Sequence, residues 1–369
     1  MKKILYVTDR EEYSEHNFIG PLFEKYLPLY AHIDIVYFSD YKSYAERKNK
    51  SIIIPTFDRK KLFAAMQEIG IDAANYDFVL VRNMHDVLEY VLDQKQKYNF
   101  KVGFRLSFPK IAASLEKAKA EKSSNLLQVV DNKIKTYTKS KLINKCDIFL
   151  PTSKQMQEVY YPDVNVPIFT IPSAIDPQRV QKKECNISEK IIFAYIGTLS
   201  ELRDFKSVLA AFSTLTKDNW ALHISTNDVT YAQDCIKSYG DIADKIQIIS
   251  VKTKDELFAF MAQCDVGLSL LPDLNIFNTS VHLKIMDYYT AGMPALMSEN
   301  QLNSTIFEDE KNAWLCDFSV TSMAKKLEKI ISMPKQKICE VGDAGQTRLL
   351  EVRNYETIAK KLSEMLAKL

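Results

Sequence analysis

A lysine and an aspartate lie three residues apart inside an apolar helical pattern in the C-terminal half of the chain. The stretch 278–294 reads NTSVHLKIMDYYTAGMP and contains Lys284 and Asp287. Residues three apart on a helix share one face, so both charges occupy one narrow strip. Two interpretations are open. Either the charges form a local ion pair on an exposed strip, or the strip lines a ligand site in which Lys284 neutralises an anion and Asp287 accepts hydrogen bonds from a polyol such as ribose.

The ends of this helix carry their own signals. Thr279 and Ser280 are both suitable N-caps for a helix over 281–291, and Gly292 suits the position after its last turn. The amino end of a helix attracts anions through its free amides and its dipole. Asn278, Thr279 and Ser280 are therefore predicted to contribute to an anion site.

A second cation follows an aliphatic run earlier in the chain. Arg203 lies in GTLSELR, directly after the run IIFAYI. An arginine in the first turn of a helix is commonly only solvated, and that alternative stays open. Gly197, in the turn, has no side chain and lets the backbone approach an anion closely. Fixed cations and backbone amides beside a diphosphate neutralise the charge that develops when it leaves.

Short β-branched and aliphatic runs alternate with segments of helical period, which is typical of βα units around parallel sheets. The expected strands are 3–8, 33–38, 51–55, 77–82, 101–105, 147–151 and 167–172 in the first half, and 191–197, 220–225, 245–250, 266–271, 294–298 and 313–316 in the second. This pattern predicts an α/β protein of two Rossmann-like, doubly wound domains that face a central cleft. Ligands are expected at the carboxyl ends of the strands.

Length and composition agree with two folded domains. The chain has 369 residues, of which 46% are hydrophobic and 26% charged, so long disordered spans are excluded. The polar segment 171–190 contains two prolines and no hydrophobic period, and we place the interdomain linker there. The predicted domains are 1–172 and 186–351.

The spacing of the cysteines and the length of the hydrophobic runs indicate the cellular compartment of the protein. The chain has six widely separated cysteines without metal-ligand spacing, which predicts reduced thiols in a cytoplasmic protein and no metal site. These cysteines are Cys146, Cys185, Cys235, Cys264, Cys316 and Cys339. No stretch approaches the roughly 18–20 apolar residues of a membrane-spanning helix, so any membrane contact is expected to be peripheral.

Positive charge is concentrated in the first half of the chain. Residues 1–180 carry 27 basic against 22 acidic residues, and 101–145 alone carry 11 against 3. The segment 110–145 is either a solvated lysine-rich helix or a surface that rests on an anionic membrane, where each lysine contributes on the order of 1 kcal/mol. Nucleic acid is disfavoured as a partner, because no reader motif or interleaved aromatic residues accompany the charge.

Three segments of the second half resemble the retaining group 1 glycosyltransferases, a family with the GT-B fold. The stretch 267–298 resembles the pattern S-x-P-x-K-x-x-E-Y-x-A-x-G-x-P, with His282 in place of its proline. IPSAIDPQRV resembles the family's interdomain segment, and FAYIGTLSELRDFKSVLAAF resembles the segment that opens its nucleotide-binding domain. In the first half, NKCDIFLPTSKQM is similar to the family's ADxIIxxS segment.

The departures from the family pattern concern charge. Asp287 stands at the second glutamate of the family's frequent E-x7-E pair, and Thr279 stands at the first. Thr198 occupies the arginine position of the family's diphosphate-binding pair, and Arg203 occupies its lysine position. One cation is therefore missing from that pair, and we expect Lys284 to replace it.

The resemblance also implies roles for the two domains. It implies that 1–172 bind the acceptor, that 186–351 bind a nucleotide sugar, and that the last helix, 352–369, crosses back onto the first domain. Val251 and Lys252 stand where the family receives the nucleobase.

Two residues of the first half follow predicted strands. His85 and Arg105 are predicted to face the cleft and bind acceptor or sugar. For His85 the alternative of an ordinary helix-start residue is the stronger one.

The sequence thus predicts a retaining, metal-independent glycosyltransferase of surface polysaccharide or glycolipid synthesis. Arg203 and Lys284 would be catalytic, Gly197 and Thr198 would lie at the diphosphate, and no cofactor is expected beyond the UDP-sugar or GDP-sugar substrate. The acceptor would be a glycan or a lipid-linked glycan, and the protein would be cytoplasmic, with any membrane contact peripheral and on the inner face. Two alternatives stay open: a catalytically degenerate GT-B binding subunit, credible because of Thr198 and Thr279, and a nucleotide-sugar epimerase of the same fold.

Overall fold

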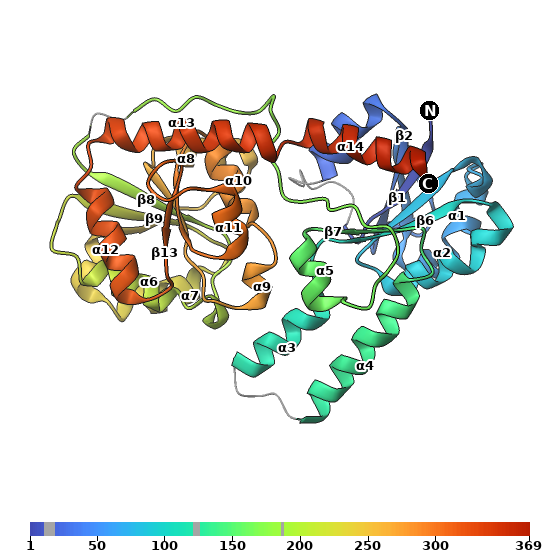
Figure 1. Ribbon diagram of the computed structural model, residues 1–369, viewed down its shortest axis with the longest axis horizontal. Helices are drawn as coiled ribbons and strands as arrows, with labels where there is room; N and C mark the ends of the chain where they lie inside the picture. Colours follow the sequence, from blue (N-terminus) through green and yellow to red (C-terminus); the bar gives the residue numbers. More distant parts are fainter. Residues whose placement is uncertain (11–18, 121–125, 186–187) are drawn as a thin grey trace. The chain divides into compact units, whose positions relative to one another are not determined.

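The chain folds into two compact α/β units. The computed structural model describes residues 1–10, 19–120, 126–185 and 188–369 (Figure 1). Unit 1 consists of Met1–Pro172 and Tyr355–Leu369, and unit 2 consists of Ser173–Asn354. Each unit is built on one largely parallel sheet with flanking helices, so the predicted α/β class with two doubly wound domains is confirmed.

Unit 1 contains a seven-stranded sheet in the order β3-β4-β2-β1-β5-β6-β7, in which only β3 runs antiparallel. The strands are β1 Lys3–Val7, β2 His32–Ser39, β3 Glu46–Lys48, β4 Ser51–Pro55, β5 Phe78–Arg82, β6 Lys101–Leu106 and β7 Ile148–Pro151. Six of the seven predicted strands are present. The seventh, 167–172, pairs with β7 only through the bridge between Phe149 and Ile168, and β3 was not predicted.

The helices of unit 1 cover both faces of this sheet. They are η1 Gly20–Tyr26, η2 Leu27–Leu29, η3 Thr56–Lys61, α1 Leu62–Glu68, η4 Ala73–Asn75, α2 His85–Tyr98, α3 Lys110–Ala120, α4 Leu126–Ile143, α5 Lys154–Tyr160 and α14 Tyr355–Lys368. The predicted helix 110–145 is thus divided into α3 and α4. The last helix, α14, contacts η1 and buries Ile358 and Leu362 in unit 1.

Arg105, predicted to bind an acceptor, is instead part of the interior of unit 1. Its side chain is fully buried. Nη1 donates to the carbonyl oxygens of Leu106 (2.9 Å) and Leu150 (2.8 Å), and Nη2 donates to Ile171 (2.8 Å). Burial lowers the pKa of Arg105 to about 9. The guanidinium therefore ties β6 and β7 to the segment that leaves the sheet, and it is not presented to a ligand.

His85 is half-buried at the first position of α2 in unit 1. Its ring lies 4.7 Å from the ring of Phe104 and 6.5 Å from that of Tyr161, measured between centroids. Burial, with a smaller contribution from the charge of Lys139, lowers the pKa of His85 to about 3. His85 is thus the first residue of α2, as the helix-start alternative predicted, and its contact with an acceptor stays a prediction.

The depressed pKa of His85 predicts an acid-sensitive unit 1. The folded state keeps the imidazole neutral while the unfolded state gains a proton below pH 6.5, so stability falls as the pH drops through that value. Between pH 6.5 and 5, the free energy of unfolding of the His85→Gln variant should fall by about 2 kcal/mol less than that of the native protein. Hydrogen exchange of peptides from α2 and β6 at the two pH values measures this difference, and the variant His32→Gln, at an exposed histidine, is the control. Equal acid sensitivity in both variants would contradict the assignment.

Unit 2 contains a six-stranded parallel sheet in the order β10-β9-β8-β11-β12-β13. Its strands are β8 Ile191–Ile196, β9 Trp220–Ser225, β10 Ile246–Ile248, β11 Val266–Ser269, β12 Ala295–Ser298 and β13 Trp314–Cys316, all six of which were predicted. Its helices are η5 Glu201–Arg203, α6 Phe205–Ser213, α7 Val229–Lys237, η6 Gly240–Lys245, α8 Lys254–Ala262, α9 Asn275–Asn278, α10 Leu283–Thr290, α11 Gln301–Ile306, α12 Val320–Ile331 and α13 Lys335–Val352.

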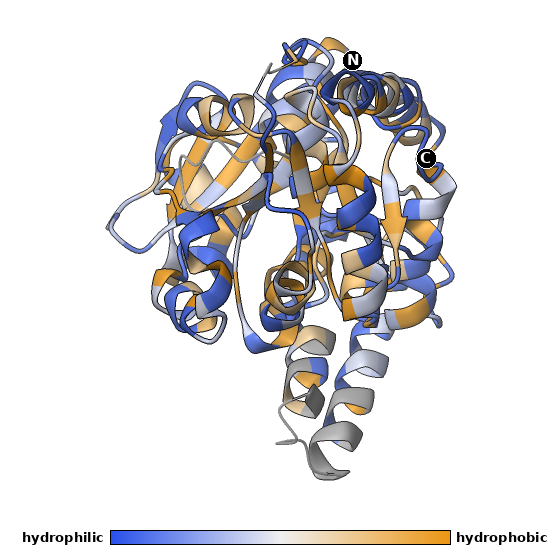
Figure 2. Ribbon diagram, turned by 90° about the vertical axis from the view of Figure 1, so that its left-hand side faces the viewer, coloured by the Kyte–Doolittle hydropathy of each residue, from blue (hydrophilic) through white to orange (hydrophobic). Residues whose placement is uncertain are grey.

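Alternate residues of each central strand point to opposite faces of the sheet in unit 2. In β8, Phe193 and Tyr195 join the apolar cluster that includes α6 and α12 residues, and Ala194 joins the cluster around α10. Figure 2 shows strands that are largely hydrophobic and helices with mixed faces, as burial on both faces requires. The helix α10 is consequently enclosed on most sides.

Tyr288 anchors α10 to the sheet. Its hydroxyl lies 3.1 Å from the carbonyl oxygen of Leu268 and 3.2 Å from that of Ala194, and it accepts a bond from the Ile196 amide at 3.2 Å. A Cβ at Gly267 would overlap the Tyr288 ring, so this strand residue must be glycine for the helix to lie this close.

Two of the six cysteines depart from the predicted reduced state. Cys185 and Cys339 form a disulfide with a Cα–Cα distance of 6.1 Å. Their separation of 154 residues hid this proximity, which arises because the segment after 173 lies along α13. Cys146, Cys235, Cys264 and Cys316 are free and buried.

The contact between Gly267 and Tyr288 predicts that Gly267→Ala destabilises unit 2. The added methyl forces Tyr288 away from the sheet, with an expected cost of about 1–3 kcal/mol. Both tryptophans, Trp220 and Trp314, are buried in unit 2, so urea unfolding followed by tryptophan fluorescence reports this unit alone. Gly240→Ala is the matched control, because nothing lies within 4 Å of a Cβ there. Equal midpoints for the two variants would refute the packing argument.

Candidate functional site

Arg203 and Lys284, the two predicted cations, converge on one aromatic residue in unit 2. Tyr195 lies in β8, η5 brings Arg203 back after that strand, and Lys284 comes from the first turn of α10. The Lys284 ammonium lies 3.9 Å from the centroid of the Tyr195 ring. Burial raises the pKa of Tyr195 to about 12, and the charge of Arg203 opposes this shift. The sequence therefore located both cations, but it did not indicate the ring between them.

The Lys284 ammonium is buried without a hydrogen-bond partner among the residues that the structure describes. Burial, followed by the charge of Arg203, holds the pKa of Lys284 well below its usual value. The ammonium does not pair with Asp287, so the alternative of a local ion pair is wrong. Leaving a buried polar group without a partner costs free energy, and an anion beside Lys284 and Arg203 would remove that cost.

The turn after β8 fits closely around the Lys284 side chain. Gly197 has φ +111°, and a Cβ there would lie 3.8 Å from Cε of Lys284. The Gly197 amide donates to the Ser225 carbonyl (2.9 Å), so it is already used within the sheet. Thr198 is exposed, and its carbonyl accepts from the Tyr195 hydroxyl at 2.9 Å. This turn positions the cations, and the amide of Gly197 is not directed at a ligand.

Arg203 is held by a second aromatic residue. Its guanidinium carbon lies 5.3 Å from the centroid of the Phe277 ring in α9. The His282 ring is 5.9 Å from Phe277, and its Nε2 lies 3.1 Å from the Phe277 carbonyl oxygen. Burial, with the charges of Lys284 and Arg203, lowers the pKa of His282 to about 3, so the neutral ring donates this bond. His282, at the family's proline position, thus fixes the residue that supports Arg203.

The start of α10 differs from the prediction. The helix begins at Leu283, and His282 at the cap position makes no side-chain capping bond. Thr279 is instead the C-terminal cap residue of α9 and is buried, while Ser280 is half-buried in the connection. The Asn278 amide group contacts the Asp273 carboxylate. None of the three residues Asn278, Thr279 and Ser280 caps α10, and their contact with an anion stays a prediction.

The remaining predicted donor residues lie further along the same edge of the sheet. Burial raises the pKa of Asp287 to about 6, against the opposing charge of Lys254. Val251 and Lys252 follow β10, which is separated from β8 by β9. Val251 is half-buried against the α10 cluster, and the exposed Lys252 donates its amide to Glu256 at 2.7 Å. Their contact with a nucleobase stays a prediction.

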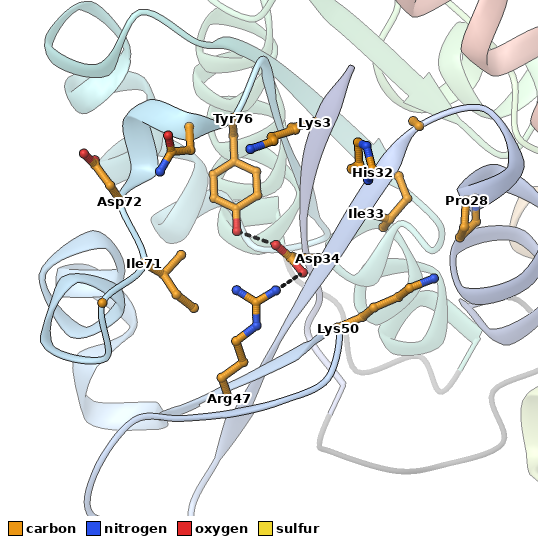
Figure 3. Close-up of a pocket in the computed structure, with 13 residues that line it drawn as sticks. Lys3, Pro28, His32, Ile33, Asp34, Arg47, Lys50, Ile71, Asp72 and Tyr76 are labelled. Atoms are coloured by element: carbon orange, nitrogen blue, oxygen red, sulfur yellow. Dashed lines mark hydrogen bonds and ion pairs between the residues drawn. The ribbon is translucent and has the colours of Figure 1, made fainter. Parts of the chain in front are cut away.

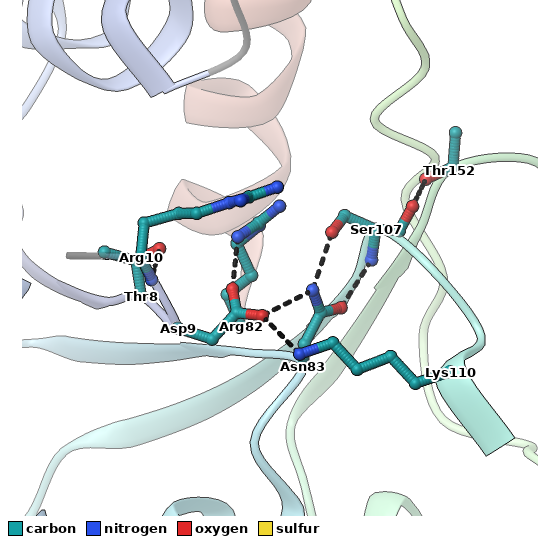
Figure 4. Close-up of polar contacts among 8 residues, drawn as sticks. All are labelled: Thr8, Asp9, Arg10, Arg82, Asn83, Ser107, Lys110 and Thr152. Carbon is teal, nitrogen blue, oxygen red and sulfur yellow. Dashed lines mark hydrogen bonds and ion pairs between the residues drawn. The ribbon is translucent and has the colours of Figure 1, made fainter. Parts of the chain in front are cut away.

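Unit 1 contains a polar cluster that the sequence analysis missed (Figure 4). The Asp9 carboxylate pairs with Arg82 and accepts from Lys110 (3.0 Å) and from Asn83 (3.2 Å). The Asn83 amide group also bonds Ser107, at 2.8 Å through its nitrogen and 2.9 Å through its oxygen. Burial opposes ionisation, but the cations and Asn83 hold the pKa of Asp9 below its usual value.

The strand ends would have identified this cluster. Asp9, Arg82, Asn83 and Ser107 lie at or just after the carboxyl ends of β1, β5 and β6, which are neighbours in the sheet. Ligands of open α/β sheets bind at such ends. Elsewhere in the described ranges, no three histidine, cysteine, aspartate or glutamate side chains form a group that could hold a metal ion.

The fold and the sequence of unit 2 are both similar to known glycosyl transferases. Residues 177–348 match the family model described as glycosyl transferases group 1. The sucrose-phosphate synthase of Thermosynechococcus elongatus superposes with a TM-score of 0.73 at 13% identity, covering 100% of this chain and 99% of that chain. The HepE protein of Anabaena, in complex with UDP and glucose, gives 0.68 at 12% identity with 100% of both chains covered.

A third solved structure is similar over the same length. The lipopolysaccharide outer core galactosyltransferase WaaB gives a TM-score of 0.67 at 11% identity, again with 100% of both chains covered. A search of curated proteins found no match. At these identities the solved structures show the fold, and the family model adds the sequence evidence for residues 177–348. The chain therefore has the GT-B fold of these structures, and its residues 177–348 are similar in sequence to the group 1 glycosyl transferases.

Proposed function

We propose that the protein transfers a sugar from a nucleotide-diphosphate donor to a glycan or lipid-linked glycan acceptor, with retention of the anomeric configuration and without a metal. The observation that carries this proposal is the buried Lys284 ammonium, which lies beside Arg203 and has no hydrogen-bond partner among the described residues. A diphosphate supplies the negative charge that these two side chains lack. Surface polysaccharide or glycolipid synthesis is the setting that we propose.

The two cations act on the leaving group. Cleavage of the bond between the anomeric carbon and the diphosphate leaves negative charge on the phosphate oxygen while the sugar becomes oxocarbenium-like. Lys284 and Arg203 are held in place by Tyr195 and Phe277, so they need little reorganisation as the charge develops. The same anion raises the pKa of Lys284 toward its usual range and keeps the ammonium protonated.

Two observations support a nucleotide as part of the donor. Asp287, with a pKa of about 6, is largely ionised at neutral pH and can accept hydrogen bonds from ribose hydroxyls. The HepE protein of Anabaena, which shares the fold, has structures with UDP and with UDP-glucose. We therefore propose a UDP-sugar or GDP-sugar as the donor.

Substitution of either cation tests the charge-neutralisation proposal. Lys284→Met and Arg203→Ala should each weaken UDP or GDP binding in calorimetry and slow nucleotide release from the matching nucleotide sugar by about 10²- to 10³-fold. Lys284→Met should leave the urea midpoint unchanged or raise it, because it removes an unpaired buried charge. Lys206→Ala, one turn away in α6 and exposed, is the matched control and should behave like the native protein.

The outcomes also separate the alternatives. Normal turnover in both cation variants would show that the charge assignment is wrong. Nucleotide binding without any release by the native protein, across a panel of nucleotide sugars and acceptors, would favour the degenerate binding subunit. Interconversion of the free nucleotide sugar would favour an epimerase.

A membrane surface is the second part of the proposal. Ile134, Tyr137 and Lys141 lie along one face of α4, and Ile134 and Tyr137 are 59% and 54% exposed. The Lys141 ammonium lies 4.5 Å from the centroid of the Tyr137 ring. No helix in the described part of the chain is long and apolar enough to span a bilayer. An exposed apolar stripe in a strongly basic segment suits the headgroup region of an anionic membrane, where a lipid-linked acceptor would lie.

Vesicle binding tests this surface. Tyr137→Ser combined with Lys141→Glu should reduce cosedimentation with vesicles containing phosphatidylglycerol by about tenfold, because it removes an anchor and reverses a charge. Lys325→Glu, an exposed charge reversal in α12 of unit 2, is the control and should have little effect. Equal binding to neutral phosphatidylcholine vesicles, or no effect of the double variant, would exclude the proposed membrane surface.

A further inference from the structure

Unit 1 has a cavity at the edge of its sheet opposite to the Asp9 cluster (Figure 3). Its volume is about 430 Å³, and it is bounded by the starts of β1 and β2, the turn between β3 and β4, and the loop after α1. The Asp9 cluster lies beyond the other end of β1, about 15–20 Å away at the usual rise of a strand. The cavity is therefore separate from the strand ends at which a glycosyl acceptor is expected.

A polar network forms one wall of the cavity. The Asp34 carboxylate accepts from Arg47 Nη2 at 3.0 Å and from the Tyr76 hydroxyl at 2.7 Å. Arg47 also donates Nε to the Asn49 carbonyl at 2.9 Å, which fixes its guanidinium at the cavity. Asp34 is thus neutralised within the protein, and Figure 3 shows the other terminal nitrogen of Arg47 directed toward Ile71.

Two further cations line the cavity without a partner. Lys3 and Lys50 make no side-chain hydrogen bond or ion pair with any described residue, and both border the cavity. The only other carboxylate in the lining is Asp72, which accepts from the Ala74 amide at 2.9 Å. With Asp34 neutralised by Arg47, the lining therefore has an excess of positive charge.

The remaining lining includes His32 and several apolar side chains. Ile33, Ile71 and the Tyr76 ring offer a surface for a carbon skeleton, and Asn75 offers an amide group. The volume suits a phosphorylated monosaccharide and is small for a macromolecule. We propose that this cavity binds a small phosphomonoester, whose phosphate is attracted by the excess positive charge of the lining and whose hydroxyl-bearing body packs toward Tyr76. This inference is independent of the proposed glycosyl transfer.

Calorimetry with ribose 5-phosphate tests the proposal on the full chain. The native protein should bind it, inorganic phosphate should compete, and ribose should not bind. Lys3→Ala combined with Lys50→Ala should weaken binding about tenfold or more, since the cavity lining loses two positive charges. Both lysines are exposed, so the double variant should fold normally. Hydrogen exchange of its β1 and β4 peptides should stay native, which checks the integrity of unit 1.

Two single variants locate the binding. Lys110→Ala removes a cation of the Asp9 cluster, and Lys284→Met removes one from unit 2; both should leave ribose 5-phosphate affinity within about twofold, the range expected for distant sites. Loss of affinity in either variant, with none in the lysine double variant, would place the ligand elsewhere and overturn the proposal. Absence of binding by the native protein at millimolar concentration would overturn it as well.

Discussion

A lysine ammonium enclosed in protein without a counter-charge is the feature on which the site of unit 2 depends. Lys284 is buried against Tyr195, and the neighbouring charge of Arg203 disfavours its protonated form further. Such an arrangement costs stability in the free protein. It is retained only if the rest of the unit holds α10 firmly, and the Tyr288 hydroxyl, bonded across β8 and β11, does so one turn further along the helix.

Buried charges are matched at several places in the described structure, including Asp265 by Lys335 (2.9 Å) in unit 2, but not at Lys284. In unit 1, Arg105 satisfies three backbone carbonyl groups, and Asp9 is matched by Arg82 and Lys110. In unit 2, the Lys284 ammonium lies over the Tyr195 ring beside the charge of Arg203, and it has no hydrogen-bond partner among the described residues. Pairing within the protein offsets the cost of burying a charge. A buried charge without such a pair instead gains free energy when a ligand of opposite charge binds. That contrast is why the diphosphate is assigned to unit 2.

Much of the site followed from residue order alone. Alternating strand and helix patterns predicted all six strands of the second sheet, and strand ends predicted that Arg203 and Lys284 would meet, because carboxyl ends of neighbouring parallel strands share one edge. The same rule applied to the first sheet would have identified Asp9 and Arg82. It was misleading for Arg105, because whether a side chain beside a strand end points outward or into the core depends on its neighbours in space.

By itself, the sequence determined the α/β class, the strand positions and the two cations, since hydrophobic period and turn residues act over short separations. Tertiary structure alone decided which groups those residues meet. It placed Tyr195 and Phe277 beneath the cations, began α10 at Leu283 because the 279–282 connection is held by His282, and joined Cys185 to Cys339. These contacts join residues far apart in the chain or depend on three-dimensional packing, and no local pattern encodes them.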